Sequence, residues 1–244
     1  MRKVLFSLLV VLCLSFSVML VAQAGGGGGN NTGDPNYVPT AAELAHLAAK
    51  DKMARMHASK ISPFAVTSKY LDVGPAEAYR EPNDHAYDNY CGPPSTQVAI
   101  RARRIAAHVP SLATVAKGEY IGARGVIIQN IQPYINKALV TTWYDYARSS
   151  SSDQFFKWAK LDVDLNYALI TGTRTLGMPG WDFGALHIVS VYGYSTNATS
   201  MNIAYVDTAS EAAGHHYAKG GRYFNIITLD NFYIWVLDNN YQVW

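Results

Sequence analysis

The sequence predicts an α+β domain in which helices come first and an antiparallel sheet follows. Helical spacing and helix start residues fall in the first two thirds of the chain, whereas the last third is dense in Val, Ile, Tyr and Phe separated by turn residues. With 244 residues, 49% hydrophobic and 16% charged, the chain can bury one sizeable core, which excludes disorder for most of it. Helices followed by a meandering sheet are typical of the α+β class.

Residues 1–24 have the layout of a secretory signal peptide. Arg2 and Lys3 precede an apolar run over residues 4–21, and a small-residue cleavage site ends at Ala24. An uncleaved membrane anchor is the alternative, because the run is nearly long enough to span a bilayer. We expect cleavage, so the protein should be secreted or at the cell surface, without membrane contact afterwards.

The charge balance excludes a basic binding surface. The formal net charge is +2, and the signal peptide removes two cations and no acids, which leaves 18 basic and 18 acidic residues. A neutral mature chain has no surplus of Lys and Arg for nucleic acid or an anionic membrane. We expect neither partner, and we expect a monomer.

The segment 25–60 is predicted to be a flexible Gly/Asn-rich linker followed by a helix. Thr40 and Glu43 form a capping-box pattern, and apolar residues continue near helical spacing to about residue 59. This helix is either a pro-segment over a cleft or an N-terminal extension packed on the domain. No further linker interrupts residues 61–244, which we interpret as one domain.

Within that domain the elements follow in a simple order. Local patterns predict three helices, at residues 93–108, 127–139 and 153–160. A strand over residues 167–171 leads into a glycine-rich loop at 172–184, which is predicted to be mobile. Four strands then follow, at residues 186–194, 201–206, 223–229 and 232–236.

The cysteine count points to a nucleophile. The chain has two cysteines, and Cys13 lies inside the predicted signal peptide, so Cys91 remains alone and cannot form an internal disulfide. Cys91 directly precedes Gly92 and the predicted helix start at Pro93, where free N–H groups and the helix dipole stabilise a thiolate. A buried, inert cysteine is the alternative.

His187 and Asp207 are the predicted partners of this thiol. His187 opens a strand directly after the glycine-rich loop, and Asp207 closes the next strand. A hairpin that sets Tyr194 opposite Met201 brings the two within about one residue of each other. Nucleophile, base and orienting carboxylate then occur in the order Cys, His, Asp. Separately, His187 could be a core-edge histidine and Asp207 a turn residue.

These motifs resemble papain-like cysteine peptidases of the double-glycine (bacteriocin-processing) peptidase-like group. The resemblance covers residues 61–244 and rests on Asp88-Asn89-Tyr90-Cys91-Gly92-Pro93, on the strand from Leu186 to Tyr194, and on Tyr205-Val206-Asp207. It implies a papain-like fold, with the nucleophile at a helix N-terminus before an antiparallel sheet. It also implies catalytic roles for Cys91, His187 and Asp207.

One departure concerns the oxyanion donor. The family commonly has a Gln a few residues before the cysteine, and no Gln occurs between Glu77 and Tyr90. Asn89 is the nearest amide and His85 the second candidate. This difference leaves room for an inactive relative.

The predicted function is a secreted thiol peptidase that hydrolyses peptide or protein substrates through an acyl-enzyme and needs no metal or other cofactor. A cell-wall amidase or acyl-transfer enzyme on the same scaffold, and an inactive exported binding module, are the alternatives. A metal corner of Asp207, Glu211, His215 and His216 is a weaker possibility, because adjacent histidines point apart on regular elements.

Overall fold

The chain folds as an α+β protein around one antiparallel sheet, as the sequence predicts. The computed structural model describes residues 37–59, 66–122, 125–210, 220–237 and 239–244. Six strands follow the order β2-β7-β3-β4-β5-β6, β1 pairs with β4, and every pairing is antiparallel. The strands are β1 (Thr67–Tyr70), β2 (Tyr146–Ala147), β3 (Leu169–Arg174), β4 (Leu186–Thr196), β5 (Met201–Val206), β6 (Phe224–Thr228) and β7 (Gln242–Val243).

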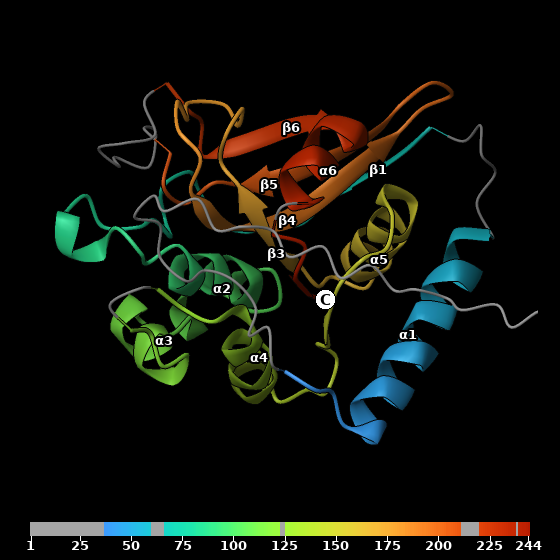
Figure 1. Ribbon diagram of the computed structural model, residues 1–244, viewed down its shortest axis with the longest axis horizontal. Helices are drawn as coiled ribbons and strands as arrows, with labels where there is room; N and C mark the ends of the chain where they lie inside the picture. Colours follow the sequence, from blue (N-terminus) through green and yellow to red (C-terminus); the bar gives the residue numbers. More distant parts are fainter. Residues whose placement is uncertain (1–36, 60–65, 123–124, 211–219, 238) are drawn as a thin grey trace, which may run out of the picture.

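Helices surround this sheet. They are α1 (Ala41–Ser59), α2 (Gly92–Arg101), α3 (Leu112–Gly118), α4 (Ile131–Leu139), α5 (Ser152–Asp164) and α6 (Leu229–Leu237), with short 3₁₀ turns η1 (His85–Tyr87), η2 (Ala106–His108) and η3 (Ile128–Asn130). In Figure 1, α2, α3 and α4 lie together below the strands, and α1 lies at the far edge beside α5. None of the helices in the described ranges has the length and apolar character that a membrane crossing requires.

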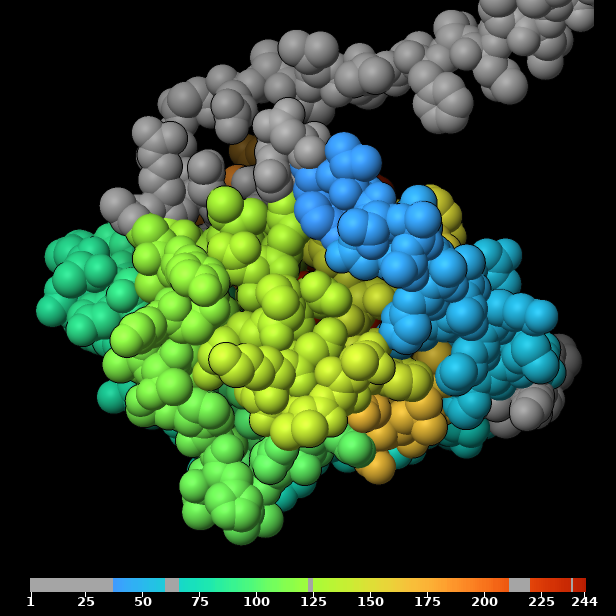
Figure 2. All heavy atoms as spheres, turned by 90° about the horizontal axis from the view of Figure 1, so that it is seen from below, coloured from blue at the N-terminus to red at the C-terminus, as the bar shows by residue number. Residues whose placement is uncertain are grey.

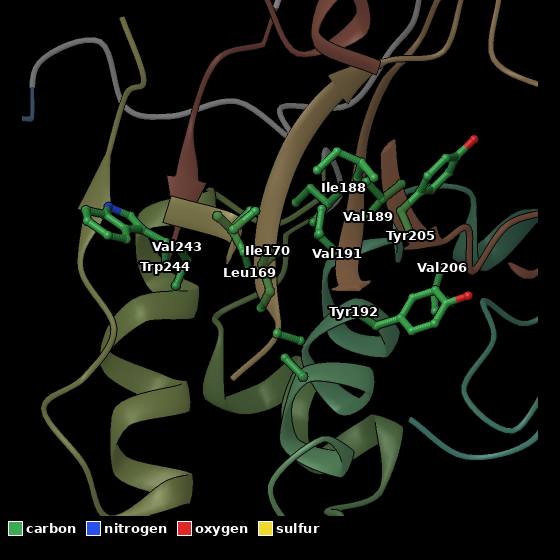
Figure 3. Close-up of a cluster of buried hydrophobic side chains, with 14 of the residues drawn as sticks. Leu169, Ile170, Ile188, Val189, Val191, Tyr192, Tyr205, Val206, Val243 and Trp244 are labelled. Atoms are coloured by element: carbon green, nitrogen blue, oxygen red, sulfur yellow. The ribbon is translucent and has the colours of Figure 1, made fainter. Parts of the chain in front are cut away.

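The core lies where the central strands meet the helices. β3, β4 and β5 are buried over most of their length, so both of their faces are covered. Figure 3 shows side chains of these strands gathered with the C-terminal residues. There Trp244 stacks on Trp158 of α5 with ring centroids 4.1 Å apart, and Tyr205 of β5 packs on Phe232 of α6 at 5.1 Å.

The hairpin register differs from the prediction. Tyr194 pairs with Ile203, and Thr196 pairs with Met201, two residues from the expected register. The pairing also shifts between Val191 and Gly193, where β4 carries an extra residue. The sequence does not show this bulge, because register depends on the length of the turn and on bulges that leave no local pattern.

The strand predicted at residues 232–236 is wrong, since these residues lie in α6. Leu229, Phe232, Tyr233 and Val236 are buried at helical spacing, whereas Ile234 is 63% exposed. A short run of apolar residues fits a buried strand and a buried helix equally well by pattern, so periodicity could not decide between them.

Other boundaries also shift. The helix predicted over residues 93–108 ends at Arg101, and the helix predicted over 153–160 extends over Ser152–Asp164. The loop predicted at 172–184 is shorter, because β3 continues to Arg174. This loop is also partly buried, since Met178 and Trp181 have almost no exposed surface. α3 and the short strands β1, β2 and β7 were not predicted.

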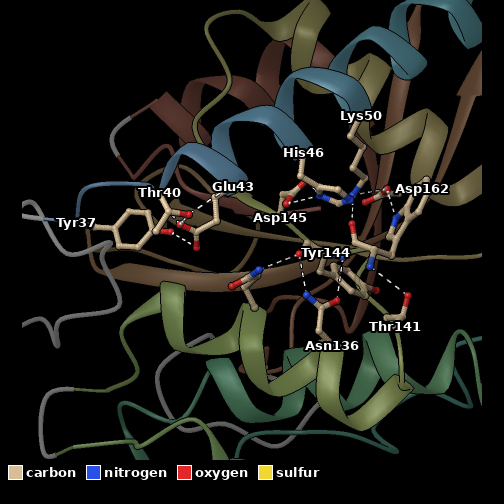
Figure 4. A network of polar contacts seen from close by, with 12 residues as sticks. Tyr37, Thr40, Glu43, His46, Lys50, Asn136, Thr141, Tyr144, Asp145 and Asp162 are labelled. Atoms are coloured by element: carbon tan, nitrogen blue, oxygen red, sulfur yellow. Dashed lines mark hydrogen bonds and ion pairs between the residues drawn. The ribbon is translucent and has the colours of Figure 1, made fainter.

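The N-terminal helix α1 is docked by contacts from three of its polar side chains to carboxylates. His46, Lys50 and His57 are spaced by four and seven residues, so they lie on one face of the helix. Each faces a carboxylate, in the pairs His46–Asp145 at 2.8 Å, Lys50–Asp162 at 3.6 Å and His57–Asp164 at 2.7 Å. Figure 4 shows the first two pairs, and Figure 2 shows α1 on the surface of the molecule. These contacts attach α1 to α5 and to the segment before β2.

Candidate active site

Cys91 lies at the start of α2, against β4. It is the N-cap residue of the helix, a proline follows within the first turn, and 2% of Cys91 is exposed. Two hydrogen bonds fasten this first turn to the strand: Ser95 Oγ donates to the Ile188 carbonyl at 2.9 Å, and Ser190 Oγ donates to the Ser95 carbonyl at 2.6 Å. The helix start is therefore held beside the strand that carries His187.

The environment of the sulfur agrees with this placement. The backbone N–H of Ile188, the residue after His187, favours the ionised form of the Cys91 thiol and lowers its pKa. The structure therefore brings Cys91 close to β4, the strand that carries the predicted base.

His187 and Asp207 form a buried hydrogen-bonded pair. His187 Nε2 lies 2.9 Å from Asp207 Oδ1, and the two residues are 2% and 1% exposed. Ser190 pairs with Val206, so Asp207, the next residue, is level with Val189 on β4. His187 lies two residues from Val189 and therefore on the same face of the sheet as Asp207. With Nε2 directed at the carboxylate, Nδ1 is the ring nitrogen left to accept a proton.

Trp181 contacts both members of this pair, and sequence reasoning missed it. Its indole N–H donates to Asp207 Oδ2 at 2.9 Å, and its ring centroid lies 5.0 Å from that of His187. The N–H of Ala209 donates to Asp207 Oδ1 at 3.0 Å. An aromatic residue in the loop ahead of His187 was the available sequence signal, but its contact depends on how that loop folds.

The charge on Asp207 is stabilised despite burial. Burial raises its pKa, but the charge of His187 and the hydrogen bonds from His187, Trp181 and Ala209 outweigh that effect, and the pKa lies below its usual range. Asp207 is therefore a carboxylate that can orient and stabilise a protonated His187.

The expectation of a stabilised thiolate is not met in this structure. Burial raises the pKa of the Cys91 thiol well above its usual range, and the charges of Glu81 and Asp207 act in the same direction. The N–H groups of Ile188 and Cys91 oppose this shift but do not outweigh it. A helix N-terminus does not activate a thiol that is removed from water beside two carboxylates.

The two oxyanion candidates occupy different environments. The His85 side chain is 84% exposed, and its Nδ1 pairs with Asp88 Oδ2 at 3.3 Å, so it faces the surface rather than the buried thiol. Asn89 is half-buried two residues before Cys91. Its role stays a prediction.

Glu81 is a further buried carboxylate at this site. It is 0% exposed, and its Oε1 accepts a hydrogen bond from the N–H of Tyr90 at 2.7 Å. Its own N–H donates to the carbonyl of Thr208 at 2.9 Å. Glu81 thus contacts the residue before Cys91 and the residue after Asp207. Sequence reasoning missed it, because a single Glu ten positions before the cysteine matches no pattern.

The described residues provide no alternative centre with this chemistry. Two surface cavities of about 700 and 380 Å³ are lined by other side chains. Across the described ranges no group of three or more His, Cys, Asp or Glu side chains could hold a metal ion. Glu211, His215 and His216 of the alternative metal corner lie outside these ranges.

Comparisons with known proteins do not assign a class. No model of a known protein family matches the chain, and a search of curated proteins finds no significant match. The function must therefore be inferred from the site itself, where the helix start that carries Cys91 packs against the strand of the His187–Asp207 pair.

Proposed function

We propose that the protein is a secreted thiol hydrolase that cleaves peptide bonds, with Cys91 as nucleophile, His187 as base and Asp207 as orienting carboxylate. The observation that carries the proposal is the 2.9 Å contact between His187 Nε2 and Asp207 Oδ1. It leaves Nδ1 as the basic nitrogen of an imidazole whose strand packs against the helix start that carries Cys91.

The proposed reaction is acyl transfer in two halves. The Cys91 thiol gives its proton to His187 Nδ1 while sulfur attacks the substrate carbonyl carbon. The carbon–nitrogen bond then breaks, and the imidazolium returns the proton to the leaving amine. In the second half His187 takes a proton from water, the hydroxide attacks the thioester carbon, and the acid product and the free thiol are released. Because the resting thiol is neutral, proton transfer accompanies attack rather than preceding it.

A papain-like fold of the double-glycine peptidase-like group remains part of this proposal. Three features support it: the order Cys, His, Asp along the chain, the placement of Cys91 at the start of α2, and the placement of His187 on a central antiparallel strand. Secretion rests on the signal-peptide pattern of residues 1–24, which lie outside the described residues. A cell-wall amidase or acyl-transfer enzyme would use the same residues.

One observation favours a second candidate, a catalytically inactive binding module. Cys91, His187 and Asp207 are at most 2% exposed, and burial keeps the thiol protonated. A hydrolase must admit a substrate carbonyl to the sulfur, whereas an inactive module needs no such access.

Turnover by matched variants tests the proposal. The full chain, Cys91→Ala and His187→Ala are incubated with casein-derived peptides and, separately, with peptidoglycan fragments, and released amines are quantified. We expect the wild type alone to cleave, with both variants reduced at least about 100-fold. His108→Ala removes an exposed imidazole and serves as control. Turnover that survives Cys91→Ala would refute the thiol mechanism, and cleavage of peptidoglycan alone would favour the amidase.

A further inference from the structure

The smaller of the two surface cavities is a second place where polar groups converge. Its volume of about 380 Å³ falls within the range of small-molecule sites, roughly 300–1,000 Å³. None of the three proposed catalytic residues lines it. Three side-chain amides, two phenol rings and one carboxylate do, those of Gln129, Asn130, Gln132, Tyr37, Tyr146 and Glu43.

The amide oxygens of this cavity remain available as acceptors. Asn130 Nδ2 donates to the Glu119 carbonyl at 3.1 Å, and Gln132 Nε2 donates to the Tyr144 carbonyl at 3.1 Å. Because a carbonyl only accepts, these contacts fix which end of each amide is the nitrogen and leave the two oxygens over. Gln129 Oε1 is buried and has no hydrogen-bond partner in the described part of the chain. A buried acceptor of this kind indicates a donor that a ligand would bring.

The charge in the cavity wall is negative. Among the described residues that line the cavity, Glu43 alone carries a charge. Hydrogen bonds from Thr40 and from Tyr37 hold the pKa of Glu43 below its usual range, so it is ionised at neutral pH. Its Oε1 accepts from the Tyr37 hydroxyl at 2.7 Å and its Oε2 from the Thr40 N–H at 2.7 Å, as Figure 4 shows. A fixed carboxylate and aromatic rings both attract a cation.

The start of α4 also lies at this cavity, and its first N–H groups are already engaged. The Asn130 N–H donates to the Ile127 carbonyl at 2.8 Å, and the Ile131 N–H donates to the Ile128 carbonyl. A helix start attracts anions through unpaired N–H groups, and here η3 uses the first of them before α4 begins. The acceptors and the carboxylate therefore determine which ligand the cavity favours.

We propose that this cavity binds an organic cation that carries N–H donors, either a primary ammonium or a guanidinium group. Its N–H groups donate to the amide oxygens of Gln129, Asn130 and Gln132, and Glu43 supplies the opposite charge. A free amine and the lysine or arginine side chain of a peptide present the same chemistry. The proposal does not depend on hydrolysis at Cys91.

A titration of the full chain tests this binding without any turnover. The ¹⁵N-labelled protein is titrated at constant ionic strength with n-butylammonium and with ethylguanidinium. The side-chain amide signal of Gln129, assigned by its loss in Gln129→Met, is followed. We expect a saturable shift with at least one cation and none with the neutral controls n-butanol and N-acetylglucosamine. No saturable shift with either cation, or an equal response to a neutral control, would overturn the proposal.

A matched pair of variants tests the charge of the cavity. Glu43→Gln removes the charge but keeps a residue that a capping box accepts, so α1 should remain folded. We expect its dissociation constant for the cation to rise at least about threefold. Glu77→Gln removes an exposed carboxylate that does not line the cavity and should leave the constant unchanged. Equal constants in the two variants would count against the proposal. If Glu43→Gln does not fold, the neutral controls on the wild type decide alone.

A peptide arm distinguishes the two sources of the cation. Nα-acetyl-lysine methylamide and its arginine counterpart carry the same cationic groups on a peptide backbone. Binding of either at least about tenfold tighter than the free cation would identify a peptide side chain as the ligand, and comparable binding would identify a free amine. A protein that binds the cation but shows no Cys91-dependent turnover would refute the hydrolase alone.

Discussion

Trp181 donates its indole N–H to the Asp207 oxygen that His187 does not use. The bond is 2.9 Å long, and the indole also lies against the imidazole of His187. Asp207 thereby has one oxygen for the base and one for the indole, which fixes the plane of its carboxylate. Trp181 is 7% exposed, so it also keeps water from the His187–Asp207 hydrogen bond.

Trp181→Phe should separate these two contributions. Phenylalanine keeps an aromatic ring near His187 but removes the hydrogen bond to Asp207, which leaves a buried carboxylate oxygen without that donor. We expect a loss of about 1–3 kcal/mol in the free energy of unfolding. In an active protein, kcat should fall about tenfold with KM nearly unchanged, because the base loses its orientation. Urea unfolding and steady-state kinetics measure the two effects.

Trp235→Phe is the matched control. Trp235 is also 7% exposed, but it packs on Tyr205 and Phe232 from α6. It should lower stability without changing kcat. Equal kinetic effects of the two substitutions would mean that Trp181 acts only through packing.

Gly92 should tolerate no side chain. A Cβ at this position would overlap Cγ1 of Val126 and approach the carboxyl group of Glu119. Gly92→Ala therefore forces the start of α2 to move, at a cost of about 1–3 kcal/mol, and displaces the adjacent Cys91. Gly122→Ala, where a Cβ meets nothing within 4 Å, is the control. Thermal denaturation of both variants checks the prediction, which an unchanged melting temperature in Gly92→Ala would contradict.

Glu119 should make the protein sensitive to alkali. Burial raises its pKa to about 8, so the folded protein holds a proton that the unfolded chain releases near pH 4.5. The contribution of this proton to stability is complete below about pH 4.5 and is lost as the pH rises toward 8. Glu119→Gln should be more stable than wild type by about 4 kcal/mol at pH 8 and similar at pH 4. The prediction would be contradicted if the free energy of unfolding changed with pH by the same amount in both proteins across this range.

Lys50 should be among the most sensitive positions on α1. Its Nζ donates to the Trp143 carbonyl at 2.8 Å and lies 4.3 Å from the Trp244 ring centroid. Burial lowers its pKa to about 8 and raises that of its partner Asp162 to about 6. Lys50→Ala leaves Asp162 buried without its cation, so we expect a loss of about 3–5 kcal/mol in urea unfolding.

Two variants control for this effect. Lys157→Ala breaks an exposed pair with Asp153 on α5 and should cost about 0.5 kcal/mol or less. Lys50→Met combined with Asp162→Asn should recover part of the lost stability, because no uncompensated charge remains. If the double variant is as unstable as Lys50→Ala, packing rather than charge holds the helix.

Much of the fold could be predicted because its elements carry local signals. The capping box that begins α1 is present, with the N–H of Thr40 donating to Glu43 Oε2 at 2.7 Å. The strands β4 and β5 also lie close to their predicted bounds. The strand predicted at residues 232–236 was wrong because a buried helix and a buried strand have similar sequence patterns over so short a run. The two-residue strands β2 and β7 are too short to leave any pattern and depend on tertiary pairing.

The candidate site likewise contains residues that the sequence predicts and residues that it does not. Cys91, His187 and Asp207 could be selected from a helix start and two strand ends, and the structure pairs His187 with Asp207 and packs the start of α2 against β4. Trp181 and Glu81 could not, because their roles depend on a loop path and on a contact across ten residues of chain. The ionisation of Cys91 was misjudged for a related reason, since burial beside two carboxylates is not visible in the residues that follow the cysteine.

The three aspartates that pair with α1 have a practical consequence for truncated forms of the protein. A shortened protein that starts at residue 61 would lose His46, Lys50 and His57 together, while Asp145, Asp162 and Asp164 would stay behind. The faces of Trp143 and Trp244 now beneath Lys50 would then meet solvent next to Asp162, which would have lost its lysine partner, whereas Asp164 would keep Lys160. Removal of α1 would thus destabilise the folded domain itself, unlike removal of a leader peptide. Any comparison of processed and unprocessed forms should therefore retain residues from Thr40 onward.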